Sequence, residues 1–376
     1  MEQKVIYNGQ ILTLTRFWAT GEPCLWITDP QQIEMPKMEF VGGHPDEYCI
    51  FLKNLTETEL AQITSLDGAP LDVREELRQF LTGKDNPMAL QDKKIMPPPW
   101  MAFPEIERYS IGWRMGYGED YIYRFGDWLD TLSPEERTEY RALFPEPVTW
   151  KGWWEDEDSG EVLVHGDFLV EAWQPEGRPK YTRQWLQQEF AAGRKRELCL
   201  FWGHQPSQDS QLTKSYLSQW WMEDFYTTAA PYLCMEQYMM AAKAELFGDK
   251  EIRDQILKCS DQKQIKALGR KVRGFDQKVW DRFKYAIVLG GNWCKFSQNR
   301  DLREFLLSTG DSVLVEASPY DAIWGIRLAA SSPEAQDPMK WRGQNLLGFA
   351  LMEVRDELRR VTQNEMLCDW STVWQK

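Results

Sequence analysis

Histidine is scarce in this sequence, and its cysteines are scattered. Only three histidines occur among 376 residues, far apart at positions 44, 165 and 204. The seven cysteines are an odd number and include no Cys-x-x-Cys pair. These features speak against a zinc site, a disulfide framework and a Ser-His-Asp mechanism. We therefore expect no metal and no cofactor, and chemistry that rests on carboxylates, lysine or arginine.

Long apolar runs and a targeting signal are also missing. No uncharged apolar stretch is long enough to cross a membrane, and Met1–Thr13 alternates polar and apolar residues instead of forming a signal peptide. We expect a cytoplasmic protein with reduced thiols. A chain of 376 residues has room for about two domains.

A glycine-rich stretch in the first half does not fit a nucleotide-binding fingerprint. Tyr109–Trp128 contains several glycines and aromatic residues, but no apolar strand leads into it and no clear helix pattern follows. The stretch is therefore predicted to be a packed aromatic segment and not a cofactor loop.

The net charge of −14 lies entirely in the N-terminal half. Residues 1–200 hold 21 basic and 35 acidic residues, whereas residues 201–376 hold 23 of each. An acidic half is unsuited to general binding of a phosphate backbone, and the asymmetry favours two units with different surfaces. We place the boundary between them at residue 196.

The N-terminal half has the pattern of an α+β domain. Asn8-Gly9 between two β-rich runs predicts a hairpin, and Ser133 followed by Pro134 predicts a capped helix start. The other expected elements are a strand over Cys24–Thr28, helices over Glu59–Thr64, Val73–Leu81 and Thr182–Gly193, a hairpin over Val162–Trp173, and a cluster of Trp150, Trp153 and Trp154 beside an acidic turn. The tryptophan cluster has two interpretations, a buried core or a protein-binding surface.

From Glu197 onward the pattern changes to helices. The expected elements are helices over Lys250–Lys258, after Asp276, over Arg300–Ser308 and over Leu346–Arg360, with a short strand at Ser312–Glu316. The sequence thus predicts a two-domain chain: an acidic, Trp-rich α+β domain (1–196), a mainly α domain (197–360) and a C-terminal extension (361–376).

Met235–Phe247 is a predicted helix that carries a notable pair of charges. Glu236 and Lys243 are seven residues apart, about two turns, so their side chains leave from nearly the same face. One interpretation is a solvated glutamate and a lysine at the edge of an apolar stripe. The other is an active-site helix with a carboxylate and an amine.

Several loops of the same half carry side chains that a plain core does not need. Arg270 and Arg273 lie near Gly269 and are suited to bidentate phosphate contacts. The remaining candidates are Trp220 in the segment Ser218-Gln219-Trp220, Asp321, Trp324 and Gly325 in one loop, and Asn345 and Gly348 before the last helix. Each of these alone is better explained by turn glycines and a packed tryptophan.

Taken together, these segments resemble the NADAR family, which includes the YbiA-like N-glycosidases. The resemblance covers residues 198–359 and leaves residues 1–196 unassigned. It rests on Phe201-Trp202-Gly203, Ser218-Gln219-Trp220, Glu236-Gln237-Tyr238, Ala242-Lys243-Ala244, Leu268-Gly269-Arg270, Lys295-Phe296, Thr309-Gly310-Asp311, Leu314-Val315-Glu316-Ala317-Ser318, Asp321, Trp324-Gly325, Asn345, Leu347-Gly348 and Leu351-Met352-Glu353-Val354-Arg355. The family commonly has a hydroxyl residue before the glutamate and a histidine after it, where this chain has Cys234-Met235 and Gln237.

The resemblance implies a compact, mainly helical domain that hydrolyses an N-glycosidic bond. Two substrate classes are associated with the family: ADP-ribose on the exocyclic amine of guanine, in nucleic acid or a nucleotide, where the enzyme acts as an antitoxin, and phosphoribosylamino-pyrimidine intermediates of riboflavin synthesis. In both, ribose C1 is bonded to an exocyclic amine. Such a glycosylamine can open to an imine, which an amine of lowered pKa can attack.

The implied catalytic residues are Glu236 as acid and base, Lys243 as nucleophile or electrostatic stabiliser, and Asp321 as a further carboxylate. Trp220 and Trp324 are expected to stack on a base, and Arg270 and Arg273 to hold phosphate. Gly325, Asn345 and Gly348 complete the expected substrate-binding set.

Three functions remain as hypotheses for the chain. The first is removal of ADP-ribose from guanine, which the added N-terminal domain favours, and the second is hydrolysis of the riboflavin intermediates. The third is a non-catalytic reader of ADP-ribose or a nucleotide. The acidic N-terminal domain is also a candidate surface for a protein partner.

Overall fold

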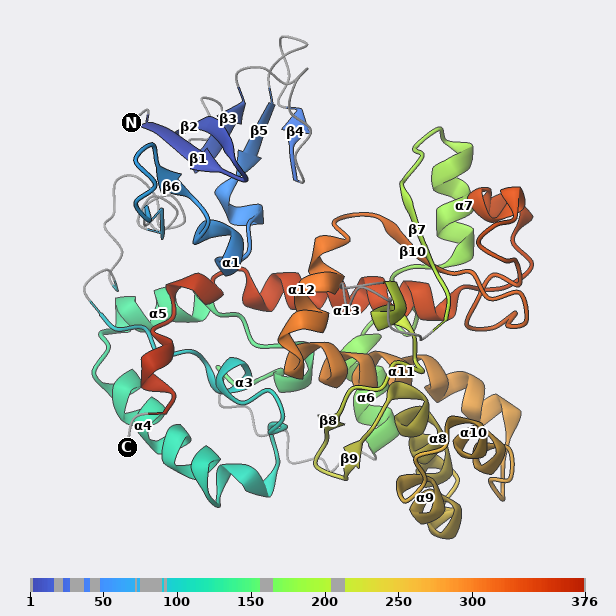
Figure 1. The fold of residues 1–376 in the computed structure, drawn as a ribbon. Helices are drawn as coiled ribbons and strands as arrows, with labels where there is room; N and C mark the ends of the chain where they lie inside the picture. Colours follow the sequence, from blue (N-terminus) through green and yellow to red (C-terminus); the bar gives the residue numbers. More distant parts are fainter. Residues whose placement is uncertain are drawn as a thin grey trace. The chain divides into compact units, whose positions relative to one another are not determined.

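The computed structural model describes residues 3–16, 23–27, 37–40, 48–71, 73–74, 90, 93–155, 165–203 and 214–374. Its contacts divide the chain into two compact units (Figure 1). The smaller unit consists of residues 1–98, 124–144 and 362–376, and the larger unit of residues 99–123 and 145–361. The break between units therefore differs from the predicted boundary at residue 196, because residues 145–196 pack with residues 197–361.

The smaller unit contains a six-stranded sheet with the order β4-β5-β3-β2-β1-β6. Its strands are β1 (Gln3–Tyr7), β2 (Gln10–Arg16), β3 (Pro23–Ile27), β4 (Glu39–Phe40), β5 (Tyr48–Phe51) and β6 (Thr64–Ser65). The predicted hairpin is confirmed: β1 and β2 pair in antiparallel fashion around Asn8 and Gly9, whose φ angles are 48° and 74°. Positive φ at both central residues is what a two-residue hairpin loop requires.

The α-helices described in the first 150 residues are α1 (Glu57–Leu60), α3 (Pro99–Ala102), α4 (Tyr117–Asp130) and α5 (Pro134–Leu143). The predicted start of α5 is confirmed, since the Ser133 side chain accepts a hydrogen bond from Glu136 N and the Glu136 carboxylate accepts one from Ser133 N.

The larger unit is built mainly from helices, with a small parallel sheet of β7 (Leu198–Phe201) and β10 (Val313–Glu316) and a small antiparallel pair of β8 (Phe225–Tyr226) and β9 (Pro231–Tyr232). Its longer helices are α6 (His165–Trp173), α7 (Arg183–Ala191), α8 (Met235–Leu246), α9 (Lys250–Leu257), α10 (Gln262–Gly269), α11 (Gln277–Gln298), α12 (Arg300–Ser308) and α13 (Leu346–Thr362). The helices predicted in this half are therefore confirmed.

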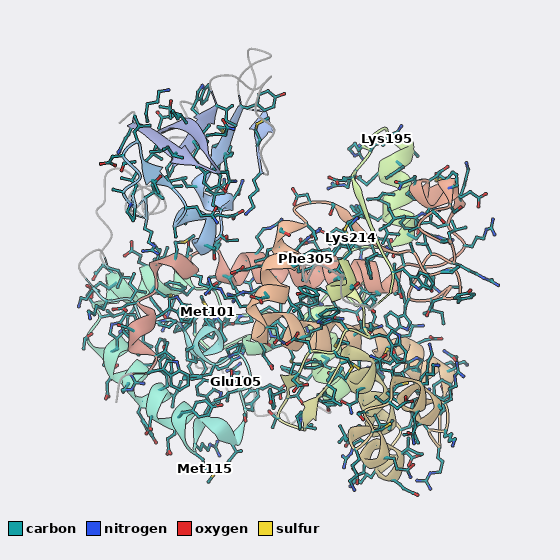
Figure 2. The ribbon with its side chains drawn as sticks, in the orientation of Figure 1. Met101, Glu105, Met115, Lys195, Lys214 and Phe305 are labelled. Atoms are coloured by element: carbon teal, nitrogen blue, oxygen red, sulfur yellow. The ribbon has the colours of Figure 1, made fainter. Side chains whose placement is uncertain are left out.

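Helix α11 lies at the centre of this unit because a continuous run of its residues, from Tyr285 to Phe296, is buried. It packs against α6, α8 and α12, while α8 also contacts α9 and α10. Figure 2 shows side chains filling the space between these ribbons. Several apolar side chains of α6 and α7, such as Leu169 and Leu186, belong to the same core, and this packing is why residues 145–196 belong to the larger unit.

Three secondary-structure predictions are wrong. Residues 165–173 form helix α6 instead of a hairpin, because Leu169 and Trp173, four residues apart, are both buried against the helical core. The glycine-rich stretch does lead into a helix, α4. Helix α1 ends at Leu60, short of the predicted Thr64, which pairs in strand β6. The helix predicted over Val73–Leu81 lies outside the described residues.

The tryptophan cluster is confirmed as a packed aromatic group. The ring centroids of Trp150 and Trp153 are 5.1 Å apart, and those of Trp100 and Trp150 are 5.4 Å apart. Its predicted acidic neighbours Asp156, Glu157 and Asp158 lie outside the described residues. Among the helices that are described, none combines the length and apolar composition that crossing a membrane requires.

Candidate active site

Glu236 is a buried carboxylate in the first turn of α8. Its side chain lies in the protein interior, with only 4% of the residue exposed. Its backbone N–H donates to the carbonyl oxygen of Gln219 at 2.9 Å, which ties the start of α8 to the loop before β8. Cys234, the N-cap residue, makes no side-chain capping bond. The helix is thus anchored by the loop and not by a hydroxyl cap.

Glu316, the last residue of β10, supplies a second buried carboxylate. Asn345 holds this strand end: its Oδ1 accepts from Glu316 N and its Nδ2 donates to Leu314 O, both at 2.9 Å. Within the described chain, Glu316 Oε2 is buried and has no hydrogen-bond partner. A buried carboxylate oxygen left unbonded is costly in a folded protein and points to a role in chemistry.

Glu236 and Glu316 share one electrostatic environment. Burial and the charge of Asp321 raise the pKa of Glu236 to about 7, against the opposing effect of Lys266 and Arg270. Burial and the charges of Asp321 and Glu236 raise the pKa of Glu316 to about 8, against the opposing effect of Lys266. Because Asp321 acts on both glutamates and Glu236 acts on Glu316, we treat them as one carboxylate cluster, defined as Glu236, Glu316 and Asp321.

Asp321 also shapes the loop that carries Trp324. Its Oδ1 accepts hydrogen bonds from the backbone N–H groups of Ile323 at 2.7 Å and Trp324 at 2.8 Å. Trp324 is half-buried and packs against the main core. Of the predicted site residues, Asp321 and Arg270 both act on the pKa of Glu236, so these three share one electrostatic environment.

A buried lysine supports the loop beside the cluster. Lys295 is fully buried, and its ammonium donates to the carbonyl oxygens of Tyr216 at 2.7 Å and Ser218 at 3.0 Å. Burial lowers the pKa of Lys295 to about 7. The loop it holds carries Trp220, whose ring centroid lies 5.6 Å from the ammonium of Lys266. This contact places Trp220 next to a cation that acts on both glutamates.

Lys243 lies two turns further along α8, in different surroundings. Its ammonium donates to Gly269 O at 2.9 Å and lies 4.3 Å from the ring centroid of Phe275 and 5.7 Å from that of Trp280. Burial lowers the pKa of Lys243. Glu236 does not contribute to the lowered pKa of Lys243. Among the described residues, no ion pair joins the two side chains. The carbonyl that Lys243 binds nevertheless belongs to the residue before Arg270.

Arg273 is not brought to the carboxylate cluster. Its guanidinium holds Asp249, with Nε on Oδ2 at 3.0 Å and Nη2 on Oδ1 at 2.5 Å, and it also pairs with Glu251 at 3.0 Å. Asp249 in turn caps α9 through Ile252 N. The structure gives Arg273 a structural role, and its predicted phosphate binding stays a prediction.

Replacing Arg273 with alanine is accordingly expected to lower the thermal midpoint and leave KM unchanged, because it removes the bidentate partner of a helix-capping aspartate. Replacing Arg270, which acts on Glu236, is expected to raise KM with little change in stability. Thermal unfolding and steady-state kinetics on the two variants separate these outcomes. A raised KM for the Arg273 variant alone would restore the phosphate-binding role.

Three other predicted substrate-binding residues have packing roles. Asn345 is fully buried with a φ of 58°, and both polar atoms of its amide bond to strand β10. A Cβ at Gly348 would overlap the carbonyl oxygen of Leu314, and one at Gly325 would lie 2.8 Å from Glu316 O. These residues allow α13 and the Asp321 loop to approach β10 closely and so position Glu316, and their contact with substrate stays a prediction.

Gln237 explains how the chain accommodates the missing histidine. Its Nε2 donates to the carbonyl oxygens of Ile256 and Cys259, both at 3.0 Å, and its Oε1 accepts from Leu233 N at 2.8 Å. The side chain is 1% exposed. It joins the end of α9 to the start of α8 and supports the helix that carries Glu236.

Sequence reasoning assigned no role to Glu316 and Lys266. A signal for Glu316 was available, since it ends the apolar run Val313-Leu314-Val315, and polar residues at the carboxyl ends of parallel strands often serve binding sites. Lys266 precedes Arg270 by four residues and thus shares its helix face. Neither residue could be assigned to the site without knowing that β10 ends near the start of α8.

The raised pKa of Glu316 predicts a pH-dependent stability. A carboxyl whose pKa in the folded state is about 8, against an ordinary value of 4.5, favours the folded state below pH 4.5. That contribution is lost as the pH rises through 8. We expect the unfolding free energy of wild type to fall by about 1–3 kcal/mol more than that of Glu316→Gln between about pH 5 and pH 8. Denaturant titrations at both pH values measure this, and parallel losses would contradict it.

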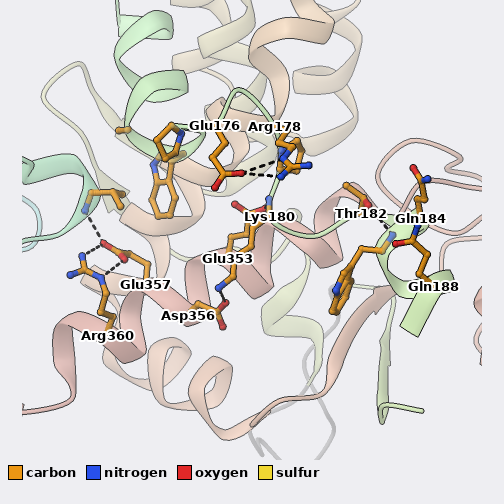
Figure 3. A pocket seen from close by; sticks show the side chains of 16 residues that line it. Glu176, Arg178, Lys180, Thr182, Gln184, Gln188, Glu353, Asp356, Glu357 and Arg360 are labelled. Carbon is orange, nitrogen blue, oxygen red and sulfur yellow. Dashed lines mark hydrogen bonds and ion pairs between the residues drawn. The ribbon is translucent and has the colours of Figure 1, made fainter. Parts of the chain in front are cut away.

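A separate groove of about 890 Å³ lies on the same unit, lined by the segment 172–188 and by α13. Figure 3 shows its ion pairs, which join Glu176 to Arg178, Lys180 to Asp356, and Glu357 to Arg360. None of its lining residues belongs to the carboxylate cluster. Across the described ranges, no group of three or more His, Cys, Asp or Glu side chains is arranged to hold a metal ion.

Comparisons with known proteins found relatives of the part of the chain that carries these residues. The model of the NADAR domain family matches residues 200–359. N-glycosidase R617 of Acanthamoeba polyphaga mimivirus is 50% identical over 145 residues, which cover 37% of this chain and 85% of the relative. N-glycosidase YbiA of Escherichia coli is 32% identical over 123 residues, or 33% of this chain and 68% of that protein. An NMR structure of E. coli YbiA aligns with a TM-score of 0.36 and 26% identity, covering 44% of this chain and 86% of that one.

The relatives define the class of the protein, an N-glycosyl hydrolase. The chain belongs to the NADAR domain family. Residues 1–199 lie outside the family match, so the family assignment describes the part of the chain that carries Glu236 and Glu316.

Proposed function

We propose that the protein hydrolyses the bond between ribose C1 and an exocyclic amine, and that it removes ADP-ribose from guanine in nucleic acid or in a nucleotide. The observation that carries this proposal is the pair of buried glutamates with raised pKa values, flanked by two cations. Such a cluster supplies an acid and a base, while Lys266 and Arg270 suit the anionic diphosphate of ADP-ribose.

The two glutamates divide the proton transfers between them. With a pKa of about 8, Glu316 is mostly protonated at neutral pH and serves as the acid. Glu236, with a pKa of about 7, is partly ionised and serves as the base. Glu316 protonates the ribose ring oxygen, which opens the glycosylamine to an iminium at C1. Environments that set two carboxyl pKa values apart are a recurring basis for such a division of roles.

Lys243 completes the proposed route as the nucleophile. Its lowered pKa increases the fraction of neutral amine. Nζ adds to C1 of the iminium and passes a proton to the guanine nitrogen. The C1–N bond to guanine then breaks, which releases guanine with its free amine and leaves a protonated lysine Schiff base at C1. Water activated by Glu236 adds to C1 of this Schiff base and releases ADP-ribose and the Lys243 amine. In the rival route, water activated by Glu236 attacks C1 directly and no covalent adduct forms.

Borohydride distinguishes the two routes. If Lys243 forms a Schiff base, reduction during turnover is expected to add the mass of the ribosyl group to wild type, and Lys243→Ala is expected to give less than about one tenth of that adduct. Intact-mass spectrometry with peptide mapping locates the modification. Equal adducts in both proteins exclude Lys243, and no adduct in wild type favours the direct route. Lys271→Ala, a change at an exposed lysine in the same unit, is the matched control.

The substrate itself is tested by a direct comparison. Wild-type protein is incubated separately with an oligonucleotide that carries ADP-ribosylated guanine and with a phosphoribosylamino-pyrimidine. Liquid chromatography with mass spectrometry then measures the released ribosyl product. We expect release of ADP-ribose from guanine at a rate at least tenfold above that of the pyrimidine, a factor of about 1.4 kcal/mol. The reverse preference assigns the protein to riboflavin intermediates.

A further inference from the structure

Two aromatic rings are exposed at one edge of the small parallel sheet. Trp202 follows the end of β7, and Tyr320 follows β10 by four residues. Trp202 is 56% exposed and Tyr320 is 86% exposed. Their ring centroids lie 6.4 Å apart with an interplanar angle of 53°. We call this pair the aromatic pair.

The aromatic pair adjoins the carboxylate cluster through the backbone. Phe201, the neighbour of Trp202, is the register partner of Glu316, and its carbonyl oxygen accepts from Ala317 N at 2.9 Å. Tyr320 directly precedes Asp321, whose charge acts on both glutamates. The rings therefore lie at the rim of the site where the strands end, the usual place for ligands of parallel sheets.

The exposure of these rings sets them apart from the other tryptophans of the site. Trp220 and Trp324 are half-buried, and Trp324 packs against the main core. Half-buried rings such as Trp220 and Trp324 can contact the part of a substrate that enters the site. The solvent-exposed rings of Trp202 and Tyr320 can contact a part of the substrate that extends out of the site.

The chemistry of the surroundings indicates what that part is. Exposed aromatic faces beside cations are the means by which proteins bind single-stranded nucleic acid, since every base has a π-face and every linkage carries a negative charge. Here Lys266 and Arg270 provide the cations: Lys266 acts on both glutamates, and Arg270 acts on Glu236. An ADP-ribosylated guanine nucleotide carries no base besides the guanine and the adenine of ADP-ribose, whereas a polynucleotide adds a neighbouring base on the strand.

We propose that Trp202 and Tyr320 stack on the nucleobase next to the modified guanine in a single-stranded polynucleotide. This inference rests on the proposed function and adds that the substrate is a strand and not a free nucleotide. The aromatic pair then contributes to KM for long substrates and has no part in the chemical step.

The test compares two substrates on a set of variants. With an ADP-ribosylated single-stranded oligonucleotide, the double variant Trp202→Ala with Tyr320→Ala is expected to raise KM about tenfold and to leave kcat within about twofold. With ADP-ribosylated guanosine monophosphate, both parameters are expected to stay at wild-type values. Tyr320→Phe keeps the ring and is expected to behave as wild type. Tyr226→Ala, at a half-exposed tyrosine of β8, is the matched control.

Several results overturn the proposal. An equal rise of KM on both substrates assigns the rings to the adenine of ADP-ribose, and no rise on either removes any role in binding. If wild type cleaves neither substrate, the proposed function fails, and fluorescence anisotropy with a labelled, unmodified single-stranded oligonucleotide decides about the aromatic pair alone. Binding that is about tenfold weaker in the double variant supports the stacking surface, and equal binding refutes it.

Discussion

Replacing Glu236 with glutamine is expected to lower kcat by about 10²–10⁴-fold, because the variant loses the group that activates water. The amide has nearly the same volume as the carboxyl, so the packing around α8 is retained. Steady-state hydrolysis of ADP-ribosylated guanine measures the loss. Calorimetric titration with ADP-ribose is expected to give an affinity close to that of wild type, because the phosphates bind to cations that the change leaves in place.

Glu353→Gln is a suitable control for this experiment. Glu353 is also buried, and burial raises its pKa to about 7. Glu353 does not belong to the carboxylate cluster, so the kcat of the Glu353→Gln variant is expected to stay near that of wild type. If wild type binds ADP-ribose without turning over any substrate, the protein is a reader and the acid–base role of Glu236 is refuted.

Replacing Gly348 with alanine is expected to have the largest effect on stability. A Cβ at this position would overlap the backbone carbonyl of Leu314, and neither α13 nor β10 can move without breaking the Asn345 bonds that join them. Overpacking of this kind costs about 1–3 kcal/mol and sometimes more. We expect a loss of at least about 3 kcal/mol or insoluble protein, measured by denaturant unfolding and by soluble yield.

Gly290→Ala is the matched control, since Gly290 also lies in a helix of the larger unit. A Cβ there would lie 2.8 Å from Cδ2 of Leu169, the end of a flexible side chain that can turn away. The gain in helix propensity, about 1 kcal/mol, offsets this contact. If Gly348→Ala is as stable as Gly290→Ala, the close approach of α13 to β10 is not a constraint on the fold.

Much of the secondary structure was predictable because its causes are local. The cap of Ser133 and the loop of Asn8 and Gly9 depend on neighbouring residues only, and both are confirmed. Helix α6 was not predictable in the same way. Its sequence is rich in residues that also suit strands, and its helical form depends on packing against α11, which lies more than 100 residues later.

The residues of the candidate active site also differ in whether local sequence or the fold determines their role. Glu236 was predictable from a helical pattern and from the family resemblance. The pKa of Glu316 is raised by burial and by the charges of Asp321 and Glu236. The burial and the contribution of Glu236, which lies 80 residues earlier, depend on the fold. Asn345 and Gly348 were assigned to substrate because conspicuous loop residues serve either ligands or close backbone contacts. Only the fold shows that they serve the latter.

The hydrogen bonds of Glu353 have a practical consequence for shortened versions of this protein. One carboxylate oxygen of this α13 residue accepts from Lys180 N at 2.8 Å and from the Tyr285 hydroxyl at 2.8 Å. A truncation that begins at residue 200, where the family match starts, removes the first of these donors and strips Leu169 and Leu186 from the core. Expression boundaries drawn at the edge of the family match therefore cut through a folded unit, and a fragment that keeps this unit whole begins no later than Pro99.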